Sequence, residues 1–428
     1  MLQDEKDYQR LLSKISLRLL PFMFLLYIIS YLDRINISFA GAPMSADLKF
    51  NEEIFGLGAG IFFFGYCMFG VPSNLALQRV GARKWISLIM VVWGFVSVFM
   101  AFVPTAELFF GMRFLLGAAE AGFFPGMIFY LTKWFRKREH GMAVAKFMSA
   151  VPAAGILGGL ISSKVLAMPP LLGLAPWKWL FIITGSPAVL FGIAVLFFLP
   201  DGPEDAKWMT DEERILLKGK LSADTLETVQ ATGTEASFWS TLLNFRVWSL
   251  ALLYFSCTFG MYGFQIWLPQ ILGASAHGDD SQVALLSAIP AVFQAFGMVV
   301  VARSSDYTGE RRFHLATAAF IASVGLIMAS IFHDPVVSMV ALCTTAFGIW
   351  GTVGPFWALP RAFLTGSSAA AAIALINSIG NLGGFAGPYI VGAIKHHSTS
   401  FSSSLLAMAV SLLLGAVLSI LMPKARTE

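Results

Sequence analysis

Residues 17–39 read LRLLPFMFLLYIISYLDRINISF, an apolar run that carries an adjacent acid and base, Asp33 and Arg34, toward its end. About 20 mostly apolar residues form a helix long enough to cross roughly 30 Å of hydrocarbon. The run therefore predicts a membrane-spanning helix. Its two charges predict a functional role, because ionisable groups are costly inside a membrane and usually face a cavity or a partner.

The rest of the chain has the same character. Of 428 residues, 57% are hydrophobic and 13% are charged, with a mean hydropathy of +0.73. Soluble proteins have about 25% charged residues, so a soluble enzyme and a disordered chain are both excluded. Further candidate spans cover residues 54–77, 85–103, 107–131, 141–163, 179–199, 247–272, 281–302, 313–332, 336–359, 369–393 and 402–422. We predict an all-α membrane protein with twelve transmembrane helices.

The distribution of Lys and Arg predicts the orientation. If the N-terminus is cytoplasmic, cytoplasmic segments hold 22 of the 29 cations and external loops hold four, which is a strong positive-inside bias. Both termini are then cytoplasmic, and the expected location is the plasma membrane, here a bacterial inner membrane. The expected organisation is a six-helix bundle over 1–200, a cytoplasmic linker over 201–245 and a second six-helix bundle over 246–428. The linker is expected to be solvated, although residues 211–221 can also form an amphipathic surface helix.

Two loops indicate that the halves are related. The loop after the second span reads QRVGARK (78–84), and the loop after the eighth reads DYTGERR (306–312). Their glycines, Gly81 and Gly309, are 228 residues apart, and each is followed by paired cations. A duplicated architecture of this kind places a central site between the halves. The candidate gating residues in these loops are Arg79, Arg83, Asp306, Arg311 and Arg312; alternatively the loops are only turns.

These loops and the 6+6 arrangement resemble the major facilitator superfamily and its G-x-x-x-D-R-x-G-R-R motif. In the first loop Asn74 stands at the motif's Gly and Gln78 at its Asp, whereas the second loop keeps the acid as Asp306. A closer resemblance, to the anion:cation symporter family of organic-anion transporters, rests on the segments YLDRIN (31–36), RFLLGAAEAGFFP (113–125), WLP (267–269), GERR (309–312) and NSIGNLGGFAGP (377–388).

The intramembrane charges predict the central site. Arg113 and Glu120 are seven residues apart and share a helical face, whereas the adjacent Asp33 and Arg34 diverge by about 100° and need separate partners. Arginine suits a carboxylate because its planar fork donates two parallel hydrogen bonds. Alternatively, an ion pair simply joins spans 1 and 4. The candidate substrate-binding residues are Arg34, Arg113, Tyr27, Tyr31, Tyr66, Gln294, Asn377 and Asn381, of which the two asparagines can instead bridge helices.

Charge also suggests the coupling ion. With Asp33 and Glu120 ionised the four intramembrane charges sum to zero, and protonating both acids leaves +2, which attracts an anion. The resemblance implies the same roles, with proton coupling at the acids and anion binding at the arginines. We therefore expect a monomeric proton symporter that imports a small carboxylate or dicarboxylate, such as a hydroxy acid, sugar acid or aromatic acid, by alternating access.

No enzyme motif is present, and the expected partners are the anion, protons and the lipid bilayer, with no nucleic acid. No cofactor or metal is expected, because the proton gradient supplies the energy. The pair His396 and His397 is expected to be solvated in an external loop. Three alternatives stay open, namely an anion exchanger of the organophosphate:phosphate type, a drug exporter and a transporter-like sensor.

Overall fold

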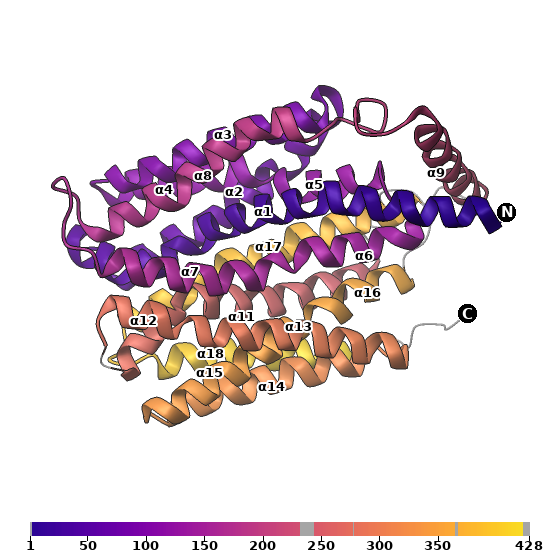
Figure 1. Cartoon of the computed structure of the whole chain (residues 1–428). Helices are drawn as coiled ribbons and strands as arrows, with labels where there is room; N and C mark the ends of the chain where they lie inside the picture. The colour runs from indigo at the N-terminus through magenta and orange to yellow at the C-terminus, as the bar shows by residue number, and fades with distance from the viewer. Residues whose placement is uncertain (1, 232–243, 277, 364–366, 423–428) are drawn as a thin grey trace.

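The computed structural model describes residues 2–231, 244–276, 278–363 and 367–422 as an almost entirely helical molecule. Helices of the first half lie on one side and helices of the second half on the other (Figure 1). The first half contains α1 (Leu2–Leu48), α2 (Glu52–Val80), α3 (Ala82–Phe99), η1 (Met100–Phe102), α4 (Ala106–Glu120), α5 (Phe123–Thr132), α6 (Lys137–Met148), α7 (Ala150–Leu166) and α8 (Pro176–Phe198). After α9 (Asp211–Ala231), the second half contains α11 (Phe245–Ala276), α12 (Asp280–Leu286), α13 (Ala288–Thr308), α14 (Arg312–Ile331), α15 (Pro335–Gly351), α16 (Val353–Phe363), α17 (Ser367–His396) and α18 (Ser402–Leu421).

The predicted spans appear as helices. Among the described residues, 11 helical segments are long and apolar enough to cross a membrane. The remaining predicted span, 369–393, lies within the 30-residue α17. Four predicted spans each consist of two helices, namely α4 with α5, α6 with α7, α12 with α13, and α15 with α16.

The linker is not simply solvated, because it contains the helix α9, which begins at Asp211 as the alternative of an amphipathic helix over 211–221 predicts. Its helix α9 packs near the start of α1, which is itself helical from Leu2, well before the predicted span. Lys14 Nζ lies 2.7 Å from Glu213 Oε2, and Leu217 of α9 is buried. Burial opposes ionisation of Glu213, but the hydrogen bonds from Lys14 and the Thr210 backbone outweigh it and hold the pKa of Glu213 below its usual value. Both α9 and the start of α1 bury apolar side chains on one face of a helix that is otherwise polar. A search for long apolar spans does not detect helices of this kind.

The two loop glycines occupy equivalent turns. Gly81 separates α2 from α3 with φ of 94°, and Gly309 separates α13 from α14 with φ of 68°. Positive φ values favour glycine because it lacks a Cβ. This agrees with the prediction of a tight glycine turn at the same point of each half.

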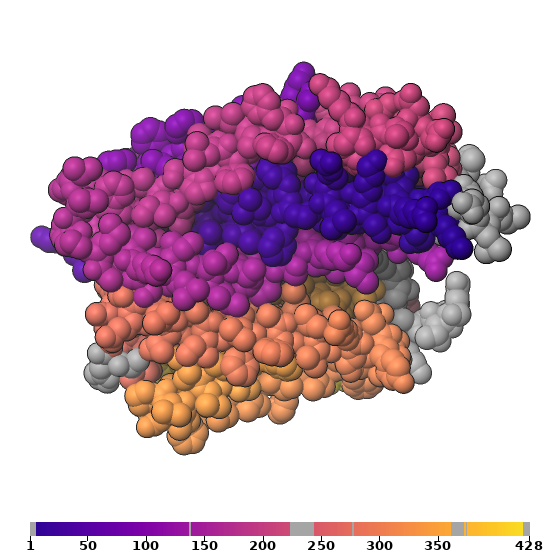
Figure 2. Space-filling view, viewed as in Figure 1, coloured from indigo at the N-terminus to yellow at the C-terminus, as the bar shows by residue number. Residues whose placement is uncertain are grey.

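The halves meet along a seam that runs between the two layers in Figure 2. In α2, a Cβ on Gly56 would lie 2.6 Å from the carbonyl oxygen of Pro388 in α17, and one on Gly60 would lie 2.6 Å from that of Phe385. In α7, a Cβ on Gly159 would lie 2.8 Å from the carbonyl oxygen of Ala284. These glycines let the helices approach closely, toward the end of the molecule opposite the start of α1.

Candidate functional site

An ion pair between the first and fourth predicted spans lies at the centre of the candidate site. Arg34 Nη2 of α1 is 3.0 Å from Glu120 Oε2, at the last residue of α4. Glu120 is fully buried, and 11% of the Arg34 side chain is exposed. The pair therefore does join these spans, which was the structural alternative. Among the described residues Arg34 Nε and Glu120 Oε1 have no hydrogen-bond partner, so both groups retain capacity for a ligand or a proton.

Arg113 crosses to the neighbouring helix instead of approaching Glu120. Its Nε donates to the carbonyl oxygen of Gly58 and its Nη2 to that of Ala59, each over 3.2 Å. The guanidinium carbons of Arg113 and Arg34 lie 5.0 Å and 5.3 Å from the ring centre of Phe62. One aromatic ring thus brings both arginines together. The sequence contained no signal for Phe62, because it is one of 39 phenylalanines in a mostly apolar chain.

Asp33 points in another direction from Arg34, as the helical phase requires. Its Oδ1 accepts a hydrogen bond from Ser97 Oγ at 2.8 Å, and its Oδ2 accepts one from Trp93 Nε1 at 3.2 Å. Asn36 connects this cluster to Thr184 of α8 over 2.9 Å. The carboxyl group is therefore enclosed within the first half, among neutral donors of α1 and α3, and the structure does not bring it to the arginines.

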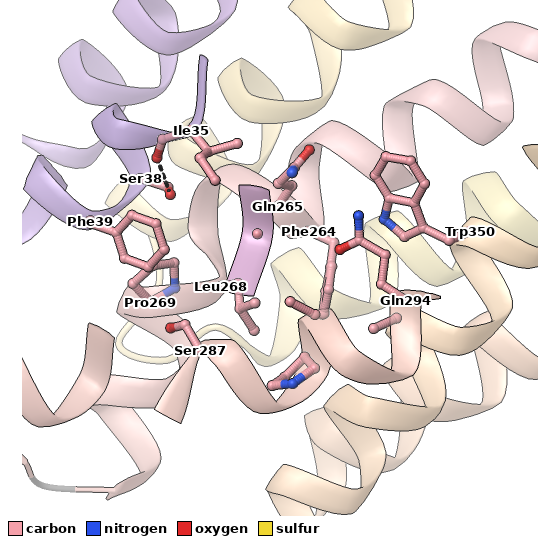
Figure 3. A pocket seen from close by; sticks show the side chains of 14 residues that line it. Ile35, Ser38, Phe39, Phe264, Gln265, Leu268, Pro269, Ser287, Gln294 and Trp350 are labelled. Atoms are coloured by element: carbon pink, nitrogen blue, oxygen red, sulfur yellow. Dashed lines mark hydrogen bonds between the residues drawn. The ribbon is translucent and has the colours of Figure 1, made fainter. Parts of the chain in front are cut away.

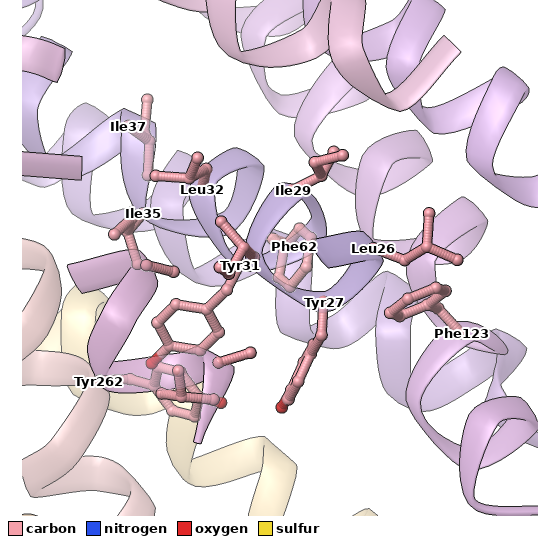
Figure 4. Close-up of a cluster of buried hydrophobic side chains, with 14 of the residues drawn as sticks. Leu26, Tyr27, Ile29, Tyr31, Leu32, Ile35, Ile37, Phe62, Phe123 and Tyr262 are labelled. Atoms are coloured by element: carbon pink, nitrogen blue, oxygen red, sulfur yellow. The ribbon is translucent and has the colours of Figure 1, made fainter. Parts of the chain in front are cut away.

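Two candidate substrate-binding residues, Tyr27 and Tyr31, lie on a face of α1 that reaches the second half. Tyr27 and Tyr31 point to one side of α1, where Tyr262 of α11 also lies (Figure 4). The Tyr31 hydroxyl and the Gln265 amide form hydrogen bonds of 2.8 and 3.0 Å across the seam. Tyr27 stacks on Phe147 at 4.5 Å, and Tyr66 carries its ring 5.1 Å from the Arg34 guanidinium. The rings of Tyr66 and Phe62 therefore both lie beside the guanidinium of Arg34, which is partly accessible.

The second half contributes amides. Gln294 lines a small pocket of about 40 Å³ together with Gln265 and Trp350 (Figure 3). The residue is buried, and among the described residues its Nε2 has no partner. In contrast, Asn381 donates to the backbone carbonyl of Asn377 within α17 over 2.8 Å. Gln294 is thus the better placed donor for a ligand, and Gln265, another polar side chain of the second half, lines the same pocket.

Each of the two candidate gating loops contains an ion pair. In the first loop Arg83 Nε lies 3.4 Å from Asp201 Oδ2, and its backbone N–H donates to Asp201 Oδ1. In the second, Arg311 Nη1 lies 2.6 Å from Asp306 Oδ1. Asp201, from the segment after α8, thus supplies the acid that the first loop lacks at Gln78. Arg79 is exposed, and Arg312 donates to the backbone oxygen of Met422.

Comparison with known proteins shows the family. A family model described as Major Facilitator Superfamily matches residues 23–388, which is most of the chain. The chain belongs to the major facilitator superfamily. Members of this superfamily among its relatives are transporters, which agrees with the expectation of a multi-pass membrane transporter and not an enzyme.

Relatives and solved structures support this membership. A protein of Agrobacterium vitis named "Putative tartrate transporter" is 45% identical over 98% of this chain and 96% of the relative. A protein of Acinetobacter baumannii named quinolone resistance transporter is 37% identical over 97% of this chain and 94% of the relative. A solved bacterial homolog of the human lysosomal transporter Spinster has a TM-score of 0.77 at 17% identity and covers 96% of both chains, which shows the major facilitator fold.

Proposed function

We propose that this protein imports a small organic anion, of the carboxylate or dicarboxylate class, by symport with protons. The observation that carries the proposal is the buried ion pair of Arg34 and Glu120 beside the seam. A substrate carboxylate competes with Glu120 for the Arg34 guanidinium. Protonation of Glu120 removes the competitor, so proton and anion each favour the binding of the other, which is the thermodynamic content of symport.

Further features support the anion and the direction. Arg113 adds a second positive charge beside the ring of Phe62, and Gln265 and Gln294 offer amide groups from the other half. The relative named as a tartrate transporter supports a hydroxy-acid substrate. Asp33 is proposed as a second proton site that acts through α1. The positive-inside bias supports cytoplasmic termini. The bacterial sources of the relatives support a bacterial inner membrane.

The test is uptake of tartrate into proteoliposomes with an imposed inward proton gradient. We expect the wild type to accumulate tartrate, and Glu120→Gln to bind tartrate and exchange it without accumulating it, because Gln resembles the protonated acid. One coupled proton supplies roughly a tenfold accumulation per pH unit. The matched control is Glu107→Gln, since Glu107 is an exposed acid in the first turn of the same helix. Full accumulation by Glu120→Gln would refute the role of Glu120.

A second candidate is export of a drug-like aromatic compound. The quinolone resistance transporter among the relatives favours it, as do the aromatic rings around Arg34. An exporter would protect cells from fluoroquinolones and would not accumulate tartrate in the proteoliposome assay. An anion exchanger would move tartrate only against a counter-anion, with no response to the proton gradient.

A further inference from the structure

A second cavity opens in the seam at the end opposite the start of α1. Its volume is about 340 Å³, within the range of small-molecule sites, and both halves line it. The first half contributes Ala42 of α1 and Glu52 of α2. The second half contributes Gln270 of α11, Asp280 of α12 and Lys395 of α17. We name this space the outer cavity.

The outer cavity adjoins the pocket of Gln265 and Gln294. Ser38, Phe39 and Pro269 line both spaces. The inner pocket in turn ends at Gln265, whose amide bonds to Tyr31. A line of polar groups therefore runs from the outer cavity toward the central ion pair.

A loose ion pair crosses the seam at the edge of the outer cavity. Lys395 Nζ lies 3.8 Å from Glu52 Oε1, and His396 Nδ1 lies 3.6 Å from Glu52 Oε2. His396 and His397 are both exposed, as expected for solvated residues, although His396 is the last residue of α17 and lies near Glu52. Charge-assisted hydrogen bonds are usually about 2.7–2.9 Å long, so Glu52 holds Lys395 only loosely. The Lys395 amine also donates to the backbone oxygen of Ser398 over 3.3 Å, and its other N–H groups are available to a better placed carboxylate.

The other polar groups of the outer cavity suit hydroxyl groups and amide acceptors. Among the described residues, the buried Gln270 Nε2 has no partner and lies beside Gly41, so rotation of this side chain into the cavity would let it donate to a ligand oxygen. The carboxylates of Glu52 and Asp280 can accept hydrogen bonds from hydroxyls. A plain anion gains less here, because two acids face one lysine. A ligand with both a carboxylate and hydroxyls satisfies all of these groups.

We propose that the outer cavity is a binding site for a small hydroxylated carboxylate, separate from the central site. The ligand's carboxylate displaces Glu52 from Lys395, and its hydroxyls bond to Asp280 and Glu52. Since Glu52 belongs to the first half and Lys395 to the second, binding loosens the seam between α2 and α17. The choice of this ligand class rests on the proposed function, but the site is tested independently of transport.

The experiment measures maleimide labelling of Ala42→Cys in the purified full-length protein. Ala42 is exposed and lines the outer cavity. The three native cysteines are replaced by Ala, and Arg34→Gln disables the central site in every variant. Ser304→Cys, an exposed position at the opposite end, is the control. The probes are tartrate and succinate, which differ only by the two hydroxyls.

We expect tartrate to slow labelling of Ala42→Cys but not of Ser304→Cys, and succinate to require a higher concentration for the same effect. Lys395→Gln should raise the half-protecting tartrate concentration roughly tenfold or more, because a charge-assisted hydrogen bond is lost, whereas Lys395→Arg should retain most protection. If Lys395→Gln does not fold, Gln270→Leu should weaken protection in the same direction.

Two results would overturn the proposal. One is a labelling rate of Ala42→Cys that does not change with tartrate. The other is that tartrate protects Ala42→Cys at the same concentration whether residue 395 is Lys or Gln. Equal protection by succinate and tartrate would overturn the hydroxylated class. Failure of the wild type to accumulate tartrate, with protection intact, would refute the proposed import but leave the outer cavity established as a binding site.

Discussion

Gly60→Ala should open the seam at the end where the halves now meet. The added Cβ would lie 2.6 Å from the carbonyl oxygen of Phe385, whereas ordinary contacts begin at 3.4 Å. The obstructing atom belongs to the backbone of α17 and cannot rotate away, so α2 and α17 must separate by several tenths of an ångström. Overpacking of this kind costs about 1–3 kcal/mol, which corresponds to a roughly 5–150-fold shift between conformations.

The assay compares cysteine labelling at Ala42 in Gly60→Ala and in Gly70→Ala. Gly70 lies in the same helix, and a Cβ there meets no atom within 4 Å. Replacing glycine by alanine raises the helix propensity equally at the two positions. The comparison therefore isolates the effect of the contact between the Gly60→Ala Cβ and the Phe385 oxygen. We expect faster labelling and altered transport in Gly60→Ala only. Gly56→Ala should act in the same direction, because its Cβ would meet the Pro388 oxygen at 2.6 Å.

Equal labelling rates in the Gly60 and Gly70 variants would refute the reasoning. A lower melting temperature of Gly60→Ala without faster labelling would mean that the collision disturbs the first half internally and leaves the conformational balance unchanged. Measurement of thermal unfolding beside the labelling rate separates these two outcomes.

Three further predictions concern the charged groups. Arg34→Lys should weaken anion binding with little loss of stability. Arg113→Lys should also lower the melting temperature, because lysine cannot keep both buried hydrogen bonds to backbone carbonyls, and the loss of one costs about 1–3 kcal/mol. Equal melting temperatures of the two variants would contradict this. Asp306→Asn should slow transport more than it changes equilibrium anion affinity, since the ion pair with Arg311 lies far from the centre; a parallel loss of both would contradict a gating role. Glu213→Gln should release α9 and expose the linker to protease. Since the pKa of Glu213 is lowered in the folded state, the same release should begin in the wild type as the pH falls below the ordinary glutamate range and be complete once the pH has passed the lowered pKa.

Much of the fold could be predicted, because a membrane imposes a simple rule on span length. The breaks within four spans could not. At Ser149 and Thr352 the side-chain hydroxyl bonds to a backbone carbonyl three residues earlier, and residues of these types also occur in the middle of unbroken helices. The docking of α9 was missed for a related reason. The pattern around Leu217 indicated an amphipathic helix, but it did not indicate that the apolar face is buried against the protein.

Within the site, helical phase correctly separated Asp33 from Arg34, because that relation depends only on local geometry. Partners in other helices were harder to predict. Arg113 bonds to backbone carbonyls, which every residue carries, so no residue type could have indicated them.

The placement of Asp33 changes the charge argument for symport. The sequence suggested four charges that cancel, but the structure encloses Asp33 among Ser97 and Trp93, away from the arginines. Around Phe62 there remain two guanidinium groups and one carboxylate, a local charge of +1 when Glu120 is ionised. A monocarboxylate can balance that charge without a proton. A dicarboxylate is balanced only when Glu120 is protonated and the local charge becomes +2. Anion binding measured over a pH range should therefore depend on pH more steeply for tartrate than for a monocarboxylate, and Glu120→Gln should remove the difference. Equal slopes in the wild type would refute this charge-balance argument, because competition between Glu120 and the ligand for Arg34 acts on monocarboxylates and dicarboxylates alike.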